Sequence, residues 1–265
     1  MDNKVVFNKD LIRRYDTFGP RYTSYPTAVQ FTTDYDDEDY RSWVKYSNED
    51  PIPSPLSLYL HIPFCDTICY YCGCSKVITK DKAKAAPYIK LLKQEIKLQG
   101  ELFANDREVT QIHWGGGTPT FLSDAEIQEI IECIHENFNV CAEDKVEFGI
   151  EVDPRTVDQQ RLKNLREMGF NRISFGVQDF DPVVQEAVNR VQSTADIKQH
   201  INDAHSFDYK SINIDLMYGL PKQSVDSFTR TLDTTIELNP DRLAVYNYAH
   251  LPEMFKPQRR IDEDE

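Results

Sequence analysis

Three cysteines stand close together in the first third of the chain and could hold a metal centre. Cys65, Cys69 and Cys72 form the spacing C-x3-C-x2-C, directly after the apolar run at 58–60. Because this spacing is so short, a single loop must present all three thiols to a common point. Cysteine thiolates are ligands of zinc and of iron–sulfur clusters. The pattern therefore predicts a metal centre carried by one loop.

The spacing favours an iron–sulfur cluster over a zinc site. Structural zinc sites combine C-x2-C with a second pair of ligands further along the chain. Ferredoxins use C-x2-C-x2-C or C-x4-C-x2-C, and the spacing here matches neither. Three protein thiols would leave one iron of a four-iron cluster free to bind a substrate or cofactor. A structural zinc site, a surface loop with chance cysteines and a disulfide cluster are the alternatives.

Polar and glycine-rich segments follow several predicted strands, which is where parallel α/β barrels bind ligands. Gly115, Gly116 and Gly117 follow the second strand, and glycines let a backbone approach a ligand with its N–H and C=O groups free. A tight turn is the alternative. Glu151 and Asp215 lie in apolar strand runs, where an unpaired carboxylate is costly. Each could accept hydrogen bonds from a ribose hydroxyl or an ammonium group, or belong to a structural ion pair.

Two further polar residues, Gln178 and Arg190, follow the fourth strand. They are candidates for orienting a second molecule that carries a carboxylate. Asp153 and Arg155 are close enough in sequence to pair with each other.

Apolar strand-like runs alternate with amphipathic segments from residue 56 onward. The predicted strands are 57–61, 111–114, 146–152, 172–177, 211–217 and 242–248. The predicted helices are 83–103, 123–138, 157–168, 182–189, 195–206 and 224–238. Such alternation implies parallel pairing through right-handed crossovers. The sequence therefore predicts an α/β fold, an incomplete (β/α)6 barrel.

Three regions are expected along the chain. Residues 1–55 form an N-terminal arm with an amphipathic segment at 9–15, and Pro51, Pro53 and Pro55 make a stiff linker at its end. Residues 56–255 form the partial barrel. Residues 256–265 are an acidic tail or a truncation point, because the chain stops soon after its sixth strand, and we expect a fragment of a longer protein.

Composition limits the partners of the chain. Its 265 residues carry a net charge of −14, which argues against nucleic acid as the main partner. No apolar run is long enough to span a membrane, and the first residues lack the pattern of a signal peptide. A reducing cytoplasm suits so many close thiols. We expect a cytoplasmic monomer without a membrane span.

The cysteine motif, placed after a strand, resembles that of the radical S-adenosylmethionine (radical SAM) superfamily. With Cys74 the motif becomes C-x3-C-x2-C-x-C, which is similar to the oxygen-independent coproporphyrinogen III oxidases. The segments 61–64, 114–120, 151–155 and 248–252 resemble the same family. So does the segment 21–26, which in that family lies near the active site.

The resemblance implies which residues bind the cofactors. Cys65, Cys69 and Cys72 would hold a [4Fe-4S] cluster, while the role of Cys74 is open. Tyr59, Gly116 and Glu151 match positions that bind a first S-adenosylmethionine (SAM). Positions near a second SAM are matched by Tyr71, Gly117, Thr118, Gln178, Arg190, Asp215 and Ala249.

The implied reaction is oxidative decarboxylation of two propionates of coproporphyrinogen III, giving protoporphyrinogen IX in haem biosynthesis. A 5′-deoxyadenosyl radical derived from SAM would abstract the hydrogen, and an electron donor would have to reduce the cluster. A haem chaperone of the same superfamily and another tetrapyrrole-modifying radical SAM enzyme are the alternatives. Members of the oxidase family carry a further C-terminal domain, so activity of this shorter chain is in question.

Overall fold

A computed structural model describes residues 6–17 and 26–262 of the chain. The chain divides into two compact units, residues 1–47 and 48–265. The first unit contains α1 (Lys9–Tyr15), the 3₁₀ helix η1 (Ala28–Gln30) and most of α2 (Asp37–Asn48). The amphipathic segment at 9–15 forms α1, and the Asn8 side chain caps this helix by accepting from the Asp10 and Leu11 N–H groups. The segment 21–26 lies outside the described residues except for Pro26.

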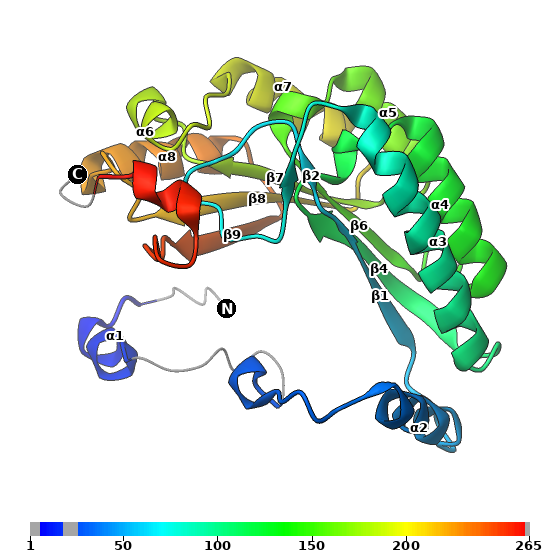
Figure 1. Ribbon diagram of the computed structural model, residues 1–265. Helices are drawn as coiled ribbons and strands as arrows, with labels where there is room; N and C mark the ends of the chain where they lie inside the picture. Colours follow the sequence, from blue (N-terminus) through cyan, green and yellow to red (C-terminus); the bar gives the residue numbers. More distant parts are fainter. Residues whose placement is uncertain (1–5, 18–25, 263–265) are drawn as a thin grey trace. The chain divides into compact units, whose positions relative to one another are not determined.

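Parallel strands form the main sheet of the second unit and pair in the order in which they occur along the chain (Figure 1). The six long strands are β1 (Leu56–Ile62), β4 (Glu108–Gly116), β6 (Glu147–Val152), β7 (Arg172–Gln178), β8 (Ser211–Tyr218) and β9 (Arg242–Asn247). A short seventh strand, β5 (Asn139–Val140), pairs with β4. Among the described residues β1 and β9 pair on one side only, so the sheet is open, as expected for an incomplete barrel.

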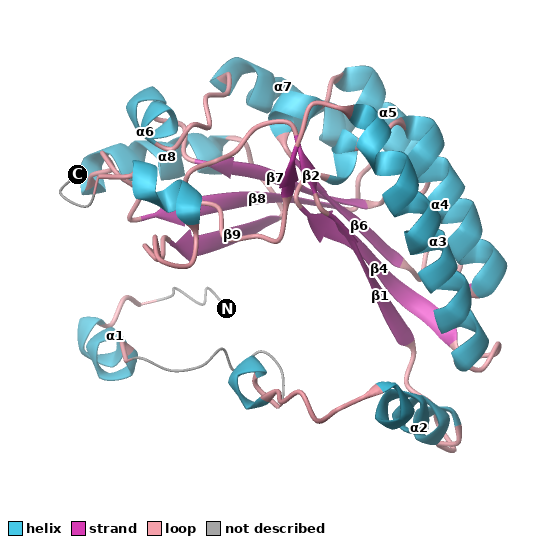
Figure 2. Cartoon of the chain, in the orientation of Figure 1, coloured by secondary structure: helices cyan, strands magenta, loops and turns pink. Residues whose placement is uncertain are grey.

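Helices connect the strands and cover one face of the sheet (Figure 2). They are α3 (Ala85–Leu102), α4 (Asp124–Asn137), α5 (Gln159–Glu167), α6 (Pro182–Ala187), α7 (Thr194–Ser206) and α8 (Val225–Glu237). The Ser123–Glu126 capping box begins α4, and Gly169, with φ +104°, follows α5. No helix in the described part of the chain is long and apolar enough to cross a membrane.

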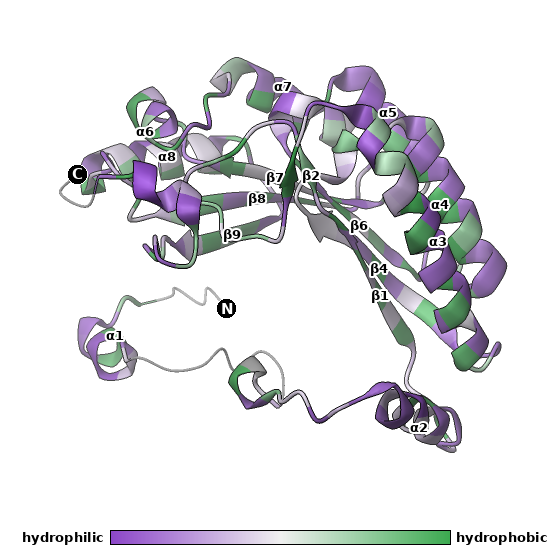
Figure 3. Ribbon diagram, viewed as in Figure 1, coloured by the Kyte–Doolittle hydropathy of each residue, from purple (hydrophilic) through white to green (hydrophobic). Residues whose placement is uncertain are grey.

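The hydrophobic core lies between the sheet and its helices, which carry both hydrophilic and hydrophobic residues (Figure 3). In β7 the side chains of Ile173, Phe175 and Val177 are buried, whereas Arg172 and Ser174 point to the opposite face and are half-buried. This alternation follows from the two-residue period of a strand. Burying each large apolar side chain stabilises the fold by about 1.5–3 kcal/mol. The opposite, concave face is left to polar residues.

Candidate active site

One cavity of about 270 Å³ lies at the carboxyl ends of the strands. Its wall includes the three predicted metal ligands, Cys65, Cys69 and Cys72. It also includes eight of the ten residues predicted to bind cofactors, namely Tyr71, Gly116, Gly117, Thr118, Glu151, Gln178, Arg190 and Asp215. Tyr59 and Ala249 are the two predicted residues that do not line it. The fold therefore gathers residues from most of the second unit at one place.

The cysteine loop, residues 65–74, leaves the sheet after β1. Its base is closed by a two-stranded pair, β2 (Phe64–Cys65) with β3 (Val77–Ile78). Cys69 is buried, and Cys65 and Cys72 are half-buried. No three Cys, His, Asp or Glu side chains within 6–17 and 26–262 are grouped closely enough to hold a metal ion. The three thiols line one cavity.

Residues far along the chain hold the cysteine loop in place. The Asn189 side chain donates to the Ile68 carbonyl at 2.6 Å, and the Tyr70 N–H donates to the Val188 carbonyl at 2.9 Å. Asn189 has a positive φ of 54°, a conformation that asparagine tolerates better than most residues. These bonds fix the middle of the loop against the segment that follows α6.

A second anchor comes from Gln258, which is buried in the 3₁₀ helix η5 (Lys256–Arg260). Its side-chain amide donates to the carbonyl oxygens of Tyr71 and Ala249 at 3.0 and 3.1 Å. The predicted site residue Ala249 therefore reaches the cavity wall only through this bridge to Tyr71. The Tyr71 side chain packs against the apolar cluster that contains Val188.

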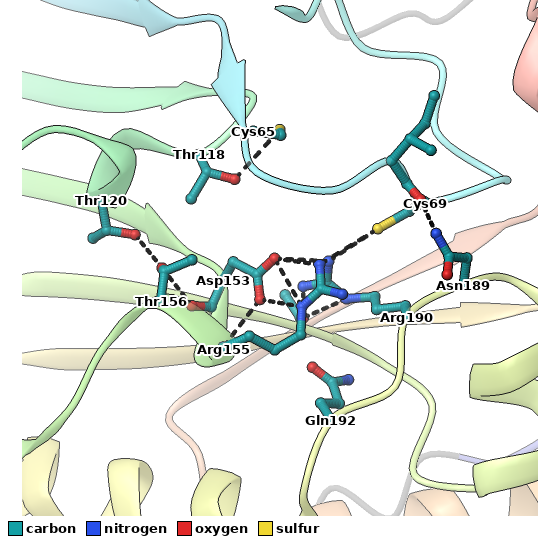
Figure 4. A network of polar contacts seen from close by, with 12 residues as sticks. Cys65, Cys69, Thr118, Thr120, Asp153, Arg155, Thr156, Asn189, Arg190 and Gln192 are labelled. Atoms are coloured by element: carbon teal, nitrogen blue, oxygen red, sulfur yellow. Dashed lines mark hydrogen bonds and ion pairs between the residues drawn. The ribbon is translucent and has the colours of Figure 1, made fainter. Parts of the chain in front are cut away.

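An acidic residue and two arginines form a network beside Cys69 (Figure 4). Asp153 pairs with Arg155 at 2.6 Å, as the sequence suggests, and also with Arg190 at 3.2 Å. Burial would raise the pKa of Asp153, but the charges of Arg190 and Arg155 lower it to about 2. Arg190 also donates to the Gly176 carbonyl and to the Sγ atom of Cys69, 3.4 Å away. The network places positive charge next to a thiol that could become a thiolate.

The thiols of the loop differ in acidity. A hydrogen bond from the Cys74 thiol is the largest cause that lowers the pKa of Cys72 to about 6, and Lys76 contributes. The same contact raises the pKa of Cys74. Burial raises the pKa of Cys65, although the Thr118 hydroxyl, 3.4 Å from its Sγ atom, opposes this. Hydrogen bonds and the Lys76 charge thus favour the thiolate form of Cys72, whereas burial opposes it for Cys65.

The glycine segment 115–117 packs closely against the end of β1. The expectation that its backbone N–H groups are free to bind a ligand is wrong for two of them. The Gly116 N–H donates to Glu151 at 3.3 Å, and the Gly117 N–H donates to the Ile62 carbonyl at 2.8 Å. These two N–H groups are therefore not free for a ligand. A Cβ atom on Gly117 would lie 2.7 Å from the Pro63 carbonyl oxygen, and Gly116 has a φ of +117°. Both glycines are required by the approach of the β1 end to the β4 end.

Glu151 joins the cavity to a row of rings on β1 and β4. It accepts from the Gly116 N–H and lies 3.2 Å from Nε2 of His113. The His113 ring stacks with the Tyr59 ring at a centroid distance of 6.0 Å. The Tyr59 hydroxyl in turn lies 3.2 Å from Nδ1 of His61. Tyr59 is therefore connected to Glu151 through His113, outside the cavity wall.

Asp215 lies on β8 with its carboxylate held by polar neighbours. It accepts from the Ser174 hydroxyl at 3.2 Å and from the Asn213 amide at 2.7 Å. Burial raises the pKa of Asp215 to about 6, while these two hydrogen bonds act in the opposite direction. No described lysine, arginine or histidine forms an ion pair with Asp215, so the alternative of a structural ion pair is not found here.

Gln178 carries the clearest sign of a missing partner. It has a positive φ of 71°, at an irregularity in the pairing of β7 with β8. Its side-chain oxygen is buried and has no hydrogen-bond partner within the described chain. A buried polar atom without a partner costs about 1–3 kcal/mol. A strained backbone and an unsatisfied acceptor on one residue are characteristic of a binding site.

Sequence reasoning did not select several residues of the wall. Lys76 reaches back to the carbonyl oxygens of Cys72 and Cys74 at 2.9 and 3.2 Å. Met217 and Tyr246 come from the ends of β8 and β9. Their types carry no specific chemical signal. Only their position at strand ends, which the alternating pattern does predict, could have pointed to them.

The residues present fit an iron–sulfur cluster with a bound SAM. The donors are thiols in one cavity, with arginine and lysine side chains around them that stabilise thiolates. The unpaired Gln178 oxygen and the carboxylates of Glu151 and Asp215 are acceptors for hydroxyl or ammonium donors. This set of acceptors matches a ligand that offers several hydrogen-bond donors.

Comparison with known proteins supports this interpretation. The oxygen-independent coproporphyrinogen III oxidase of Pseudomonas aeruginosa is 51% identical over 265 residues, covering 100% of this chain and 57% of that protein. The Escherichia coli protein of the same name is 49% identical over 258 residues, covering 97% of this chain and 55% of that protein. The chain thus spans slightly more than half the length of these relatives.

A solved structure is also similar. The coproporphyrinogen III oxidase from Escherichia coli, described as a radical SAM enzyme, matches with a TM-score of 0.88 and 46% identity, covering 98% of this chain and 57% of that one. Residues 59–235 match the radical SAM superfamily, and this stretch contains the cysteine loop and most of the cavity wall. The chain therefore belongs to the radical SAM superfamily.

Proposed function

We propose that the protein carries out oxygen-independent oxidative decarboxylation of coproporphyrinogen III to protoporphyrinogen IX in haem biosynthesis. The observation that carries this proposal is the single cavity that combines three cysteines with eight predicted cofactor residues. The names of relatives that are 51% and 49% identical favour the oxidase over the haem chaperone and over other tetrapyrrole-modifying enzymes.

Cys65, Cys69 and Cys72 would hold the [4Fe-4S] cluster as its three protein ligands. When bound, the cluster and SAM would supply the 5′-deoxyadenosyl radical needed to remove a hydrogen from a propionate side chain. Arg190 donates to Cys69 at 3.4 Å, so it stabilises negative charge on that sulfur.

The first SAM is assigned to Tyr59, Gly116 and Glu151. Glu151 presents a carboxylate that is already oriented by the Gly116 N–H and by His113. It is suited to accept from an ammonium group. Tyr59 acts indirectly, because its ring stacks on His113, which contacts Glu151.

A second SAM is assigned to a group around Gln178, Arg190 and Asp215. Gln178 offers an unpaired acceptor, and Asp215 offers a carboxylate beside it on the wall. Arg190 holds Asp153 and the Gly176 carbonyl, so it acts by positioning β7 and the cysteine loop. The other members of this group are Tyr71, Gly117, Thr118 and Ala249.

The proposal extends to partners and location. An external one-electron donor would reduce the cluster, and the protein would act as a cytoplasmic monomer on a tetrapyrrole. Because the relatives are longer, the experiment must separate cofactor chemistry from substrate turnover.

The test is anaerobic reconstitution with iron and sulfide, followed by reduction with dithionite in the presence of SAM. Release of 5′-deoxyadenosine together with a vinyl product from coproporphyrinogen III is the expected result. Deoxyadenosine without decarboxylation would contradict the proposed substrate reaction while keeping the radical SAM chemistry. Failure to bind iron would contradict both.

A further inference from the structure

A second cavity, of about 330 Å³, lies on the concave face of the sheet, which the helices leave uncovered. Its wall comes from residues on β4, β6, β7, β8 and β9. The side chains that face it follow the two-residue period of the strands. Those that carry polar groups are Gln111, His113, Glu147, Glu151, Arg172, Ser174, Ser211, Asn213, Asp215, Arg242 and Tyr246.

This concave cavity continues into the cavity that holds the cysteines. Glu151, Asp215 and Tyr246 line both. A ligand can therefore place one part beside the proposed cofactors and another part deeper along the strands. Together the two volumes suit one edge of a tetrapyrrole, a pyrrole ring with its side chains, and not a complete macrocycle.

The charges are separated along this path. The carboxylates of Glu151 and Asp215 lie at the shared end, toward the cofactor cavity. Arg172 and Arg242 come from the first residues of β7 and β9, at the opposite end. Arg242 pairs in register with Asn213, two residues before Asp215, which is about 7 Å along a strand.

Only one of these two arginines is neutralised. Arg172 forms an ion pair with Glu147 at 2.5 Å. The Arg242 guanidinium makes no hydrogen bond or ion pair with any described residue of the chain, although the protein as a whole carries a charge of −14. Neighbouring acids are already engaged, because the Asp241 carboxylate accepts from the Ile212 N–H at 2.8 Å. An unpaired guanidinium on a cavity wall is a site for an anion.

We propose that Arg242 binds a carboxylate of the tetrapyrrole, on a propionate other than the one that reacts. The inference rests on the proposed function, and it identifies Arg242 as a residue that determines substrate specificity. Arg172 lies at the same end of the concave cavity as Arg242. It is paired with Glu147 through one nitrogen, so its other N–H groups can still donate to a ligand. Arg242 thereby sets which pyrrole edge lies beside the cofactor cavity.

The test measures binding of coproporphyrin III, the fluorescent oxidised form of the substrate with the same propionates, to the anaerobically reconstituted protein. Its methyl ester, which lacks the carboxylates, is the second probe. The variants are Arg242→Gln, Arg242→Lys and the control Arg230→Gln on the outer helix α8. Deoxyadenosine release without tetrapyrrole reports the cofactor site separately.

Losing one charge-assisted hydrogen bond should raise the Kd for coproporphyrin III about tenfold or more in Arg242→Gln. Arg242→Lys should recover part of this affinity, and the ester should bind all variants alike. Unchanged affinity in Arg242→Gln, or an equal loss in Arg230→Gln, would overturn the inference and leave the proposed function intact. If the unchanged protein releases deoxyadenosine but does not bind coproporphyrin III, the proposed substrate fails and the inference falls with it.

Discussion

Asp215 and Gln178 occupy the cavity wall although each costs the folded chain stability. The Asp215 carboxyl has a pKa raised to about 6 by burial, and the Gln178 oxygen is buried without a partner in the described residues. Such residues are expected where binding, not stability, decides the side chain.

The raised pKa of Asp215 predicts a pH dependence of stability. Its protonated form is favoured in the folded state, so its contribution is present below about pH 4 and is lost as the pH rises through about 6. From pH 5.5 to pH 7.5 the free energy of unfolding should fall by about 1 kcal/mol more in the cofactor-free protein than in Asp215→Asn. Urea unfolding at both pH values measures this.

Asp233→Asn is the control, because Asp233 is exposed on the outer helix α8. The control should keep the pH dependence of the unchanged protein. An identical dependence in Asp215→Asn would show that the Asp215 carboxyl is not buried as described.

Gln178 predicts opposite effects on stability and on binding. Gln178→Leu removes the unpaired acceptor, so the free energy of unfolding should stay equal or increase by about 1 kcal/mol. The same change should weaken SAM binding to the reconstituted protein roughly tenfold. Urea unfolding and equilibrium dialysis with labelled SAM are the two measurements. Loss of stability together with unchanged SAM affinity would mean that Gln178 is a structural residue.

At the scale of elements, two segments that are not strands hold the cysteine loop in place. They are η5 and the segment that follows α6. The buried side chain of Gln258 joins the carbonyl groups of Tyr71 and Ala249 and the Leu251 N–H. The phenyl ring of Phe255 packs on the same loop, because a Cβ atom on Gly73 would lie only 3.1 Å from it. The segment expected to be an acidic tail therefore contains a part that supports the site.

We predict that Gln258→Ala loosens the cysteine loop. Loss of the buried amide should lower the free energy of unfolding by about 1–3 kcal/mol, because two carbonyl groups lose their donor. It should also raise the rate at which a thiol reagent modifies Cys69 in the cofactor-free protein. Lys256→Ala, an exposed neighbour in η5, should change neither quantity. Equal thiol reactivity in both variants would contradict the anchoring role.

The long strands could be predicted from sequence, whereas the supports of the site could not. The apolar runs that became β6, β7 and β8 were placed within one or two residues, and so were the helices predicted at 123–138 and 157–168, which became α4 and α5. The pair β2–β3 has two residues in each strand, too few to show a period. The Gly116 N–H is occupied by Glu151, a partner from a neighbouring strand that local glycine chemistry cannot reveal.

At the scale of the whole molecule, the last strand of the described sheet, β9, has one face toward the concave cavity and one exposed apolar face. Arg242, Ala244 and Tyr246 of β9 face the concave cavity, so Leu243 and Val245 face the opposite side. Their exposed fractions are 45% and 46%. Among the described residues β9 has a strand partner on one side only. An exposed apolar edge of this kind favours association between copies.

Val245→Lys should therefore reduce concentration-dependent aggregation of the chain. A lysine on the outward face adds charge at the edge without entering the concave cavity. Light scattering across a range of protein concentrations measures the effect. Val225→Lys, at an 84% exposed position on α8, is the control and should leave aggregation unchanged. Equal improvement by both substitutions would point to charge in general and not to the β9 edge.

The bond from Asn189 to the cysteine loop also sets an order of events during synthesis. Its acceptor, the Ile68 carbonyl, is 121 residues earlier in the chain. At ribosomal rates of about 5–20 residues per second, the thiols emerge on the order of ten seconds before their anchor exists. The loop that presents Cys69 can take its final shape only after translation has passed β7 and α6. Delivery of iron and sulfide to a preformed loop is therefore a late step in the life of the nascent chain.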